Sequence, residues 1–511
     1  MTSKLFSAAI VGLEAEPIEV EVDIGRGLPA FNIVGLPDEA IKESKERVRA
    51  ALKNSDHILP ASRITVNLAP ADLKKEGPAY DLPIALGILI ADQKIPNPPV
   101  GGREKSLFVG ELSLDGRLRP IKGVLSIALL AKKRCFQNLY LPADNLLEAQ
   151  VVGGLKIYPV TTIKDLIFHL KGEKQLKIAV GQKNSFIPKR IEYEFDFADI
   201  KGQEQAKRAL EIAAAGGHNV LLTGPPGAGK TLLARSFPSI LPAMIEEEVL
   251  EVTKIYSVAG LLPTKEQLVL ERPFRSPHHT ASYVALVGGG NVPKPGEVTL
   301  AHKGVLFLDE LPEFPRSVLE ALRQPLEDQH ITISRAAGSL HLPAQFILIA
   351  ARNPCPCGYF NDPVKPCTCA PSQILRYQKK ISGPLLDRID LHIEVPPVKY
   401  EKLRQEQLAE ESKEVRKRVE KARQIQLERF DKTKTNSQMS NKELKEHCRL
   451  DEQAENLIKE AMIKFGLSAR AYSRLLKIAR TIADLEGITS ISSAHVAEAI
   501  QYRFPAQTFL V

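Results

Sequence analysis

The pattern of apolar and polar positions predicts a first segment of mixed strands and helices. Residues 17–24 alternate between apolar and acidic side chains, which predicts a half-exposed strand. Residues 38–53 carry apolar side chains at helical spacing with acids in the first turn, which predicts an amphipathic helix. We expect three further elements: a strand over 63–68, an apolar helix over 82–90 and a strand over 107–112. Residues 1–170 are therefore expected to form an α/β or α+β domain with a sheet.

Short apolar runs in the middle of the chain predict buried strands. Residues 220–222, 305–308 and 346–351 are such runs, typical of a sheet covered on both faces. Residues 330–346 alternate on both sides of a small-residue turn, which predicts a β-hairpin with Arg335 near its tip. Taken alone, Arg335 is either a solvated turn residue or a functional one.

The remaining segments differ in charge and periodicity. Residues 171–196 are polar and basic with few large apolar anchors, as in a linker. Residues 401–435 are densely and evenly charged, which predicts a long exposed helix with a mostly solvated face. Residues 441–508 read as all-helical, with one apolar stripe typical of a core. The expected division is 1–170, a linker 171–196, a nucleotide domain 197–400, a charged helical connection 401–440 and a helical domain 441–511.

Composition limits the class of protein. A chain of 511 residues exceeds one core, and its 44% hydrophobic and 25% charged content is ordinary for a soluble globular protein. The net charge of +8 is compatible with nucleic-acid contact without implying it. No apolar run approaches the roughly 20 residues that span a membrane, and we identify no signal peptide. Four of the six cysteines fall within fifteen residues, unlike a secreted disulfide framework, so we expect a cytoplasmic protein.

A phosphate-binding loop follows the first buried strand. The pattern GxxxxGK[ST] is matched at every fixed position, between a predicted strand and a predicted helix. Backbone N–H groups of such a loop and the end of the next helix point at phosphate oxygens. Lys230 would reach the β- and γ-phosphates, and the Thr231 hydroxyl would hold Mg²⁺. The expected nucleotide-binding residues are Gly224, Pro225, Pro226, Gly227, Ala228, Gly229, Lys230 and Thr231. The sequence thus predicts binding of ATP or another nucleoside triphosphate with Mg²⁺.

Polar residues end the two later buried strands. Asp309 and Glu310 follow the run 305–308 and lie 79 residues after Lys230. We expect Asp309 to hold Mg²⁺ through a water molecule and Glu310 to polarise the attacking water as a general base. Asn353 comes two residues after the run 346–351, where an amide can orient the water or touch the γ-phosphate.

Four cysteines follow in a C-x-C-x₉-C-x-C arrangement. Two thiolate pairs joined by a short loop suit tetrahedral Zn²⁺, although C-x-C is tighter than the usual C-x₂₋₄-C spacing. The alternative is a set of reduced structural thiols. The residues are Cys355, Cys357, Cys367 and Cys369. His278 and His279 are further possible ligands, with a polar loop as the simpler interpretation.

Longer motifs give the chain a family resemblance. They occupy residues 275–280 (RSPHHT), 295–297 (PGE), 304–310 (GVLFLDE), 353–359 (NPCPCGY), 382–396 and 467–487. With these motifs the chain resembles the magnesium-chelatase-like AAA+ ATPases of the YifB/ComM group over nearly its whole length. The resemblance implies a multidomain α/β fold: an S5/Lon-protease-like N-terminal domain, an AAA+ P-loop core with hairpin and cysteine-rich insertions, and a C-terminal helical lid.

The resemblance also implies roles for particular residues. Asn353 is similar to sensor 1. Arg388 is similar to an arginine finger that reaches the nucleotide of a neighbouring subunit, which implies a ring, usually a hexamer. Arg470 resembles sensor 2 on the lid, with Arg474 as a rival one turn later. The hairpin with Arg335 resembles one that faces the pore of replicative helicases, which implies a DNA phosphate contact. For each arginine, the structural alternative is an ion pair.

The resemblance to Lon fails at its catalytic positions. Ala79 stands where the nucleophilic serine would be and Leu125 where the lysine would be, while nearby Lys122 is not at the matching position. Since a Ser–Lys dyad needs both members, proteolysis is not expected. The resemblance implies a hexameric ATP-driven motor on single-stranded or branched DNA, a helicase driving branch migration in homologous recombination and natural transformation. The alternative is a chelatase-type or protein-remodelling motor acting on a protein partner. No membrane partner is expected.

Overall fold

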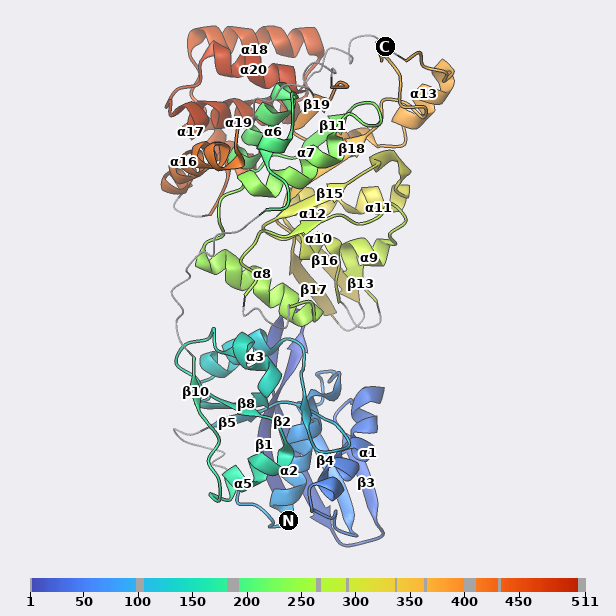
Figure 1. Cartoon of the computed structure of the whole chain (residues 1–511), viewed down its shortest axis with the longest axis vertical. Coiled ribbons are helices and arrows are strands. Elements are labelled where there is room, and N and C mark those ends of the chain that lie inside the picture. The colour runs from blue at the N-terminus through green and yellow to red at the C-terminus, as the bar shows by residue number, and fades with distance from the viewer. Residues whose placement is uncertain are drawn as a thin grey trace. The chain divides into compact units, whose positions relative to one another are not determined.

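A computed structural model describes residues 2–97, 105–181, 193–262, 268–290, 294–335, 338–362, 365–398, 410–430 and 433–503 (Figure 1). Contacts divide the chain into two compact units. Unit 1 comprises Met1–Ile187 and Glu246–Val269, and unit 2 comprises Pro188–Ile245 and Leu270–Val511. The sequence predicts more segments than this, because a boundary in composition need not be a boundary in packing.

An eight-stranded mixed sheet organises unit 1. Its order is β10-β9-β8-β5-β1-β2-β4-β3, and the long hairpin of β1 and β2 pairs Thr2 with Asp23 through to Val11 with Glu14. The strands are β1 (Thr2–Val11), β2 (Glu14–Gly25), β3 (Ala30–Val34), β4 (Arg63–Ala69), β5 (Ser106–Phe108), β8 (Asn138–Pro142), β9 (Lys156–Val160) and β10 (Ala179–Val180). The helices are α1 (Glu39–Asn54), α2 (Asp81–Ala91), α3 (Val124–Lys133), α4 (Leu146–Ala149), α5 (Ile163–Leu170) and α8 (Glu246–Ala259). The expected strands over 17–24 and 63–68 and the helices over 38–53 and 82–90 are confirmed.

Three parts of unit 1 differ from the sequence prediction. The strand expected over 107–112 is two strands, because β5 joins the large sheet whereas β6 (Glu111–Leu112) pairs with β7 (Leu118–Arg119). Within the expected linker, β10 pairs with β9. Helix α8, expected in the nucleotide domain, packs on α3, and its Ser257 carbonyl accepts from the Gly123 N–H at 3.1 Å. Local periodicity could not show which elements these segments pair with or pack against.

A five-stranded parallel sheet organises unit 2, in the order β12-β15-β18-β11-β19. The strands are β12 (Phe274–Arg275), β15 (Val305–Leu308), β18 (Ile347–Arg352), β11 (Val220–Thr223) and β19 (Leu391–Glu394). All four residues of β15 are buried, which explains why a parallel strand covered on both faces reads as an unbroken apolar run. The carboxyl ends of the three predicted central strands therefore meet at one edge.

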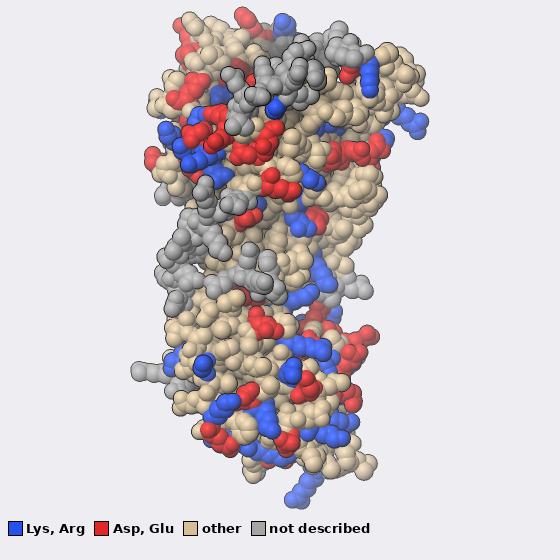
Figure 2. All heavy atoms as spheres, in the orientation of Figure 1, with Lys and Arg blue, Asp and Glu red and all other residues tan. Residues whose placement is uncertain are grey.

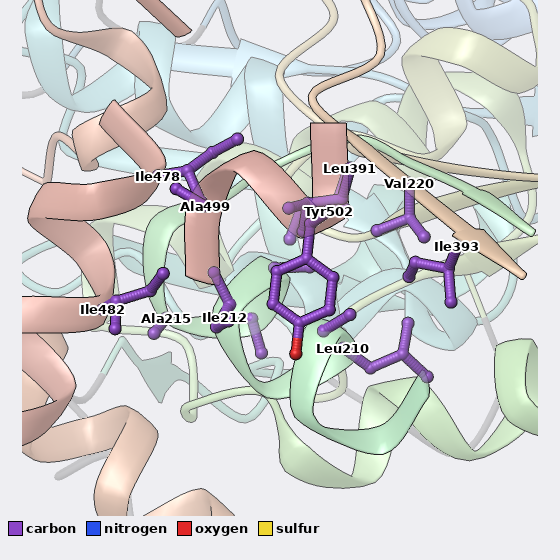
Figure 3. Packing of buried hydrophobic residues seen from close by; sticks show 14 of the residues in the cluster. Leu210, Ile212, Ala215, Val220, Leu391, Ile393, Ile478, Ile482, Ala499 and Tyr502 are labelled. Carbon is purple, nitrogen blue, oxygen red and sulfur yellow. The ribbon is translucent and has the colours of Figure 1, made fainter. Parts of the chain in front are cut away.

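Two buried clusters, one on each face of the sheet, pack the helices of unit 2 against it. Leu210 of α6, Val220 of β11, Ile478 of α19 and Tyr502 of α20 belong to the same buried cluster (Figure 3). A fully buried Leu or Ile side chain stabilises a fold by about 1.5–3 kcal/mol. The longer helices are α6 (Glu204–Gly216), α7 (Lys230–Ser236), α13 (Pro371–Gln378), α16 (Ser412–Phe430), α17 (Asn441–His447), α18 (Glu452–Phe465), α19 (Ala469–Glu486) and α20 (Ser493–Arg503). The shorter ones are α9 (Tyr283–Val287), α10 (Glu297–Leu300), α11 (Arg316–Ala321), α12 (Arg323–Asp328) and α14 (Gly383–Leu386).

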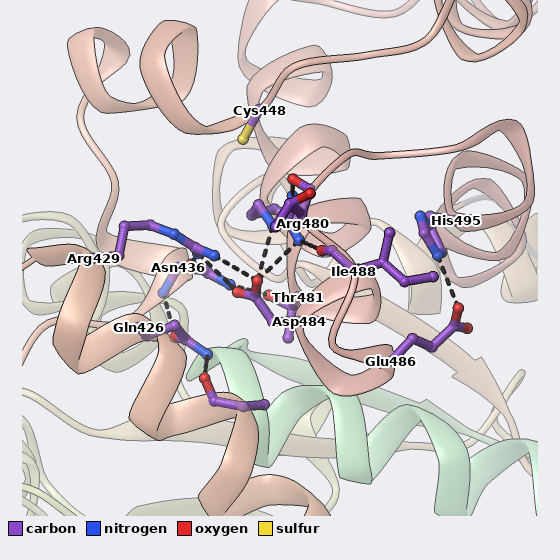
Figure 4. A network of polar contacts seen from close by, with 12 residues as sticks. Gln426, Arg429, Asn436, Cys448, Arg480, Thr481, Asp484, Glu486, Ile488 and His495 are labelled. Carbon is purple, nitrogen blue, oxygen red and sulfur yellow. Dashed lines mark hydrogen bonds and ion pairs between the residues drawn. The ribbon is translucent and has the colours of Figure 1, made fainter.

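The charged helix α16 is not simply solvated, contrary to the sequence prediction. Val415, Val419 and Ala422 form a buried face that packs against α6 and α19. Its Arg429 donates to the buried Asp484 carboxylate of α19 at 2.6 and 2.8 Å, and Asn436 donates to the same group at 2.7 Å (Figure 4). Residues 401–409, 431 and 432 of the expected charged connection lie outside the described residues.

The predicted hairpin is confirmed as β16 (His330–Arg335) and β17 (Gly338–Pro343), which form a two-stranded sheet among the described residues. A second small ribbon joins β13 (Gly288–Gly289) to β14 (Lys294–Pro295). None of the described helices is both long and apolar enough to cross a bilayer.

Candidate active site

The phosphate loop lies at the carboxyl end of β11 and leads into α7. Gly227 and Gly229 have φ angles of 77° and 90°, a left-handed region that glycine enters without a steric penalty. Lys230, the first residue of α7, donates its ammonium to the Gly224 carbonyl at 2.7 Å and to the Pro225 carbonyl at 2.9 Å. Burial lowers the pKa of Lys230, while the Asp309 and Glu310 carboxylates act in the opposite direction. A buried cation thus faces the loop expected to bind phosphate.

Thr231 and Asp309 supply two adjacent oxygens that suit Mg²⁺. The Thr231 hydroxyl donates to Asp309 Oδ2 at 2.9 Å. Two neighbouring ligands of an octahedral Mg²⁺ with bonds of about 2.1 Å lie about 3.0 Å apart. The oxygen donors and their spacing therefore fit the ion that accompanies a bound nucleoside triphosphate.

Glu310 follows Asp309 in a backbone conformation that is uncommon for a residue with a side chain. Its φ is 51°, and its side chain is 55% exposed. His279 Nδ1 lies 3.4 Å from Glu310 Oε2. The His279 ring is itself packed against His278, at a centroid distance of 4.1 Å, and against the edge of Phe314 at 6.4 Å. His279 was not expected at this place, because residues 275–280 approach Glu310 only through the pairing of β12 with β15.

Asn353 completes the group at this edge of the sheet. It directly follows β18, and its Oδ1 accepts from the Lys230 ammonium at 3.1 Å. Lys230, Thr231, Asp309, Glu310 and Asn353 therefore come from the ends of three neighbouring parallel strands, although 123 positions separate the first from the last. An ammonium, two carboxylates, a hydroxyl and an amide at one strand edge can bind a triphosphate and polarise a water.

Arg388 and Arg470 lie at the opposite edge of the same sheet. Arg388 precedes the amino end of β19, whereas the phosphate loop follows the carboxyl end of β11, and these strands are parallel. Both guanidinium groups contact the carboxylate of Glu327 on α12. The Arg388 side chain is 6% exposed and that of Arg470 is 46% exposed. The structure thus joins two arginines that the sequence places 82 residues apart, but brings neither to the phosphate loop of its own chain.

Arg474, the rival for the Arg470 role, has a structural partner. Its guanidinium contacts the buried Asp390 carboxylate, which also lies 3.2 Å from His218 Nδ1. Burial alone would raise the pKa of Asp390, but Arg474, His218 and Arg503 outweigh it and hold that pKa well below its ordinary value. Arg470 and Arg474 line a cavity of about 490 Å³ with Glu327, Asp390 and Lys477.

The four cysteines come together despite the tight C-x-C spacing. Cys355 Sγ lies 3.3 Å from Cys357 Sγ and 3.7 Å from Cys367 Sγ, and all four sulfurs fall within 4.8 Å of one another. Sulfurs around a tetrahedral Zn²⁺ with bonds of about 2.3 Å lie about 3.8 Å apart. The backbone N–H groups of Tyr359 and Thr368 lower the pKa of the Cys357 thiol to about 5. The cluster is therefore able to bind a metal such as zinc. His278 does not belong to this cluster, and its Nδ1 instead forms a hydrogen bond of 2.8 Å with Thr280 Oγ1.

Two further sequence predictions concern residues other than those at the phosphate loop. Arg335 ends β16 opposite Gly338, but its side chain lies outside the described residues. In unit 1, Ala79 lies in a 3₁₀ turn and Leu125 is buried in α3, so these two positions supply neither a nucleophile nor a base.

Comparison with known proteins identifies three matching segments of the chain. Three family models match: Magnesium chelatase, subunit ChlI, over residues 196–403; Subunit ChlI of Mg-chelatase over 20–145; and Magnesium chelatase, subunit ChlI C-terminal, over 409–503. The competence protein ComM of Haemophilus influenzae is 45% identical over 98% of this chain and 97% of its own. YifB of Escherichia coli is 42% identical over 98% of this chain and 97% of its own.

A more distant similarity covers only part of the chain. Lon protease 2 of Bacillus subtilis is 32% identical over 30% of this chain and 32% of its own.

The structure and the comparisons agree on the family of this chain. They agree in the parallel sheet with its phosphate loop, in the helical C-terminal region and in the near full-length identities. This chain belongs to the ComM/YifB family of magnesium-chelatase-like AAA+ proteins.

Proposed function

We propose that this protein is an ATP-hydrolysing motor that acts on DNA as a hexameric ring and drives branch migration during recombination and natural transformation. The observation that carries the ATPase part is the convergence of Lys230, Thr231, Asp309, Glu310 and Asn353 at one strand edge. Lys230 would neutralise the β- and γ-phosphates, and Thr231 with Asp309 would hold Mg²⁺. Glu310 would polarise the attacking water and Asn353 would orient it against the γ-phosphate.

The position of the two arginines supports a ring. Arg388 and Arg470 lie at the sheet edge opposite to the phosphate loop, so they would act on the nucleotide of a neighbouring subunit. Because Glu327 binds both guanidinium groups, their transfer to a γ-phosphate requires these ion pairs to open. Arg388 would then act as the finger and Arg470 as the second sensor.

Mixing two inactive variants tests this geometry. Glu310→Gln lacks the base but keeps its arginines, whereas Arg388→Ala keeps an intact nucleotide site but lacks the finger. If the finger acts between subunits, mixed rings combine an intact site with an intact finger at some interfaces, and part of the ATPase activity returns. Mixtures that form rings yet stay inactive would contradict the assignment.

The similarity to a competence protein supports DNA as the substrate. Charge adds little, because Lys and Arg are interspersed with Asp and Glu on the face drawn in Figure 2. Arg335 at the end of β16 is proposed to contact a DNA phosphate, in which case Arg335→Ala weakens DNA binding and reduces its salt dependence. We further propose that the four cysteines bind Zn²⁺, which metal analysis of protein purified without chelators would establish.

ATP-dependent movement of a synthetic three- or four-stranded DNA junction is the deciding assay, with Glu310→Gln as the control. Movement by the wild type and not by the variant establishes the DNA motor. ATPase turnover that no DNA affects, without junction movement, would instead indicate a motor that acts on a protein partner.

A further inference from the structure

The loop that carries the four cysteines also touches the nucleotide site. Only Pro354 separates Asn353 from Cys355, whose side chain is fully buried. Since consecutive Cα atoms are about 3.8 Å apart, the position of Cys355 restricts where the Asn353 side chain can lie. Asn353 is therefore tethered on one side by β18 and on the other by the cluster.

The same loop packs against the phosphate loop. Gly358 has a φ of +87°, and its N–H donates to the Cys355 carbonyl at 3.0 Å. A Cβ atom at Gly358 would lie 2.5 Å from Cδ of Pro226, which is a ring atom that cannot swing away. Glycine thus permits a close approach between the cysteine loop and the middle of the phosphate loop.

The far end of the cysteine loop returns to Asn353. After Cys367 and Cys369 the chain enters α13, whose Tyr377 hydroxyl hydrogen-bonds the backbone of Asn353. The next residue, Gln378, donates to the Pro354 carbonyl at 3.4 Å. Asn353, Tyr377 and Glu310 line one cavity of about 470 Å³. Both ends of the loop therefore support the residue that contacts Lys230.

Packing alone provides little to hold this loop. Among the described residues from 356 to 370, only Gly358 is buried, so the loop contributes almost no apolar side chain to a core. Ordering such a loop costs conformational entropy that its packing repays poorly, and a metal bound by four thiolates supplies a cross-link that lowers this cost. The Sγ atoms of Cys355, Cys357 and Cys367 lie 3.3–3.7 Å apart, close to the separations in a tetrahedral zinc site.

We infer that a zinc ion bound by the four cysteines is a positioning element of the ATPase site: it holds the cysteine loop against Pro226 and thereby keeps Asn353 in place beside Lys230. This inference rests on the proposed ATPase function and assigns the metal a role in it. ATP hydrolysis then depends on the metal, whereas ATP binding by the phosphate loop does not. The cysteines and Gly358 are positioning residues in this inference, because they act through Asn353 and Pro226.

The test compares three variants of the full-length protein. In the double variant Cys367→Ser, Cys369→Ser, the zinc content should fall from about one ion per chain to near zero. Its kcat for ATP hydrolysis should fall by at least about tenfold, whereas its Kd for a fluorescent ATP analogue should stay within about threefold of the wild-type value. Gly358→Ala keeps all four ligands but pushes the loop from Pro226, so it should retain zinc and still lose kcat. Cys135→Ser, an exposed cysteine in unit 1, is the matched control and should change none of these values.

Distinct results overturn each step. A zinc-free double variant with wild-type kcat, or a zinc-containing Gly358→Ala variant with wild-type kcat, contradicts the positioning role. If the wild-type protein hydrolyses ATP but contains no zinc, the metal site is refuted and the proposed ATPase function is not. If the protein contains zinc but does not hydrolyse ATP, the proposed function is refuted instead. If the double variant does not fold, removing zinc from wild-type protein with a chelator and adding zinc back measures the same dependence.

Discussion

Replacement of Glu310 by glutamine separates chemistry from binding and stability. The exchange keeps the size of the side chain and removes its negative charge. Because the Glu310 side chain is 55% exposed, the free energy of unfolding should change by less than about 0.5 kcal/mol. Lys230 has its hydrogen bonds to Gly224, Pro225 and Asn353 rather than to Glu310, so ATP affinity should change little.

The expected effect on turnover is much larger. A positioned general base contributes a factor of about 10² to 10⁴, or roughly 3–5 kcal/mol of activation free energy. We therefore expect kcat for phosphate release to fall by that factor, and bound ATP to persist. Glu313→Gln is the matched control: its carboxylate lies one 3₁₀ turn away and pairs with Lys380 at 3.1 Å. A Glu310→Gln variant that retains kcat within about threefold of the wild type would refute the assigned base.

Further substitutions test other contacts. Thr231→Ala removes the hydroxyl 2.9 Å from Asp309, so the Mg²⁺ concentration that half-activates hydrolysis should rise about tenfold or more; an unchanged Mg²⁺ titration would exclude Thr231 as a ligand. Asp484→Ala leaves Arg429 and Arg480 without their buried partner, and should lower the free energy of unfolding by about 3 kcal/mol in urea denaturation. The pKa of Asp390 is held below its ordinary value of about 4, so its ionised form stabilises the fold above that pH and the contribution is lost as the pH falls below it. Asp390→Asn should therefore be less stable at neutral pH and lose less stability on acidification, and identical pH profiles for variant and wild type would contradict this.

The local sequence pattern was sufficient to predict an element that is long, or a motif whose residues are contiguous in the sequence. The helix α1 carries its Asp38 cap and apolar spacing in its own sequence, and the alternation around β16 and β17 predicted the hairpin. Short elements were predicted less well: the break between β5 and β6 depends on which strands they pair with. The face of α16 that packs on α6 was obscured because surrounding charges dominate its composition.

Sequence motifs alone identify the phosphate loop, the two acids after β15 and the amide after β18, because each motif is a few contiguous residues at the end of an apolar run. The contacts that these motifs make with one another depend on the tertiary structure. Parallel pairing of β11, β15 and β18 brings Lys230 to Asn353 and Thr231 to Asp309. The contacts of Glu327 with two distant arginines, of His279 with Glu310 and of Gly358 with Pro226 likewise join segments that are remote in sequence. No local periodicity encodes such contacts, since they arise from strand order and from the packing of loops at a shared edge.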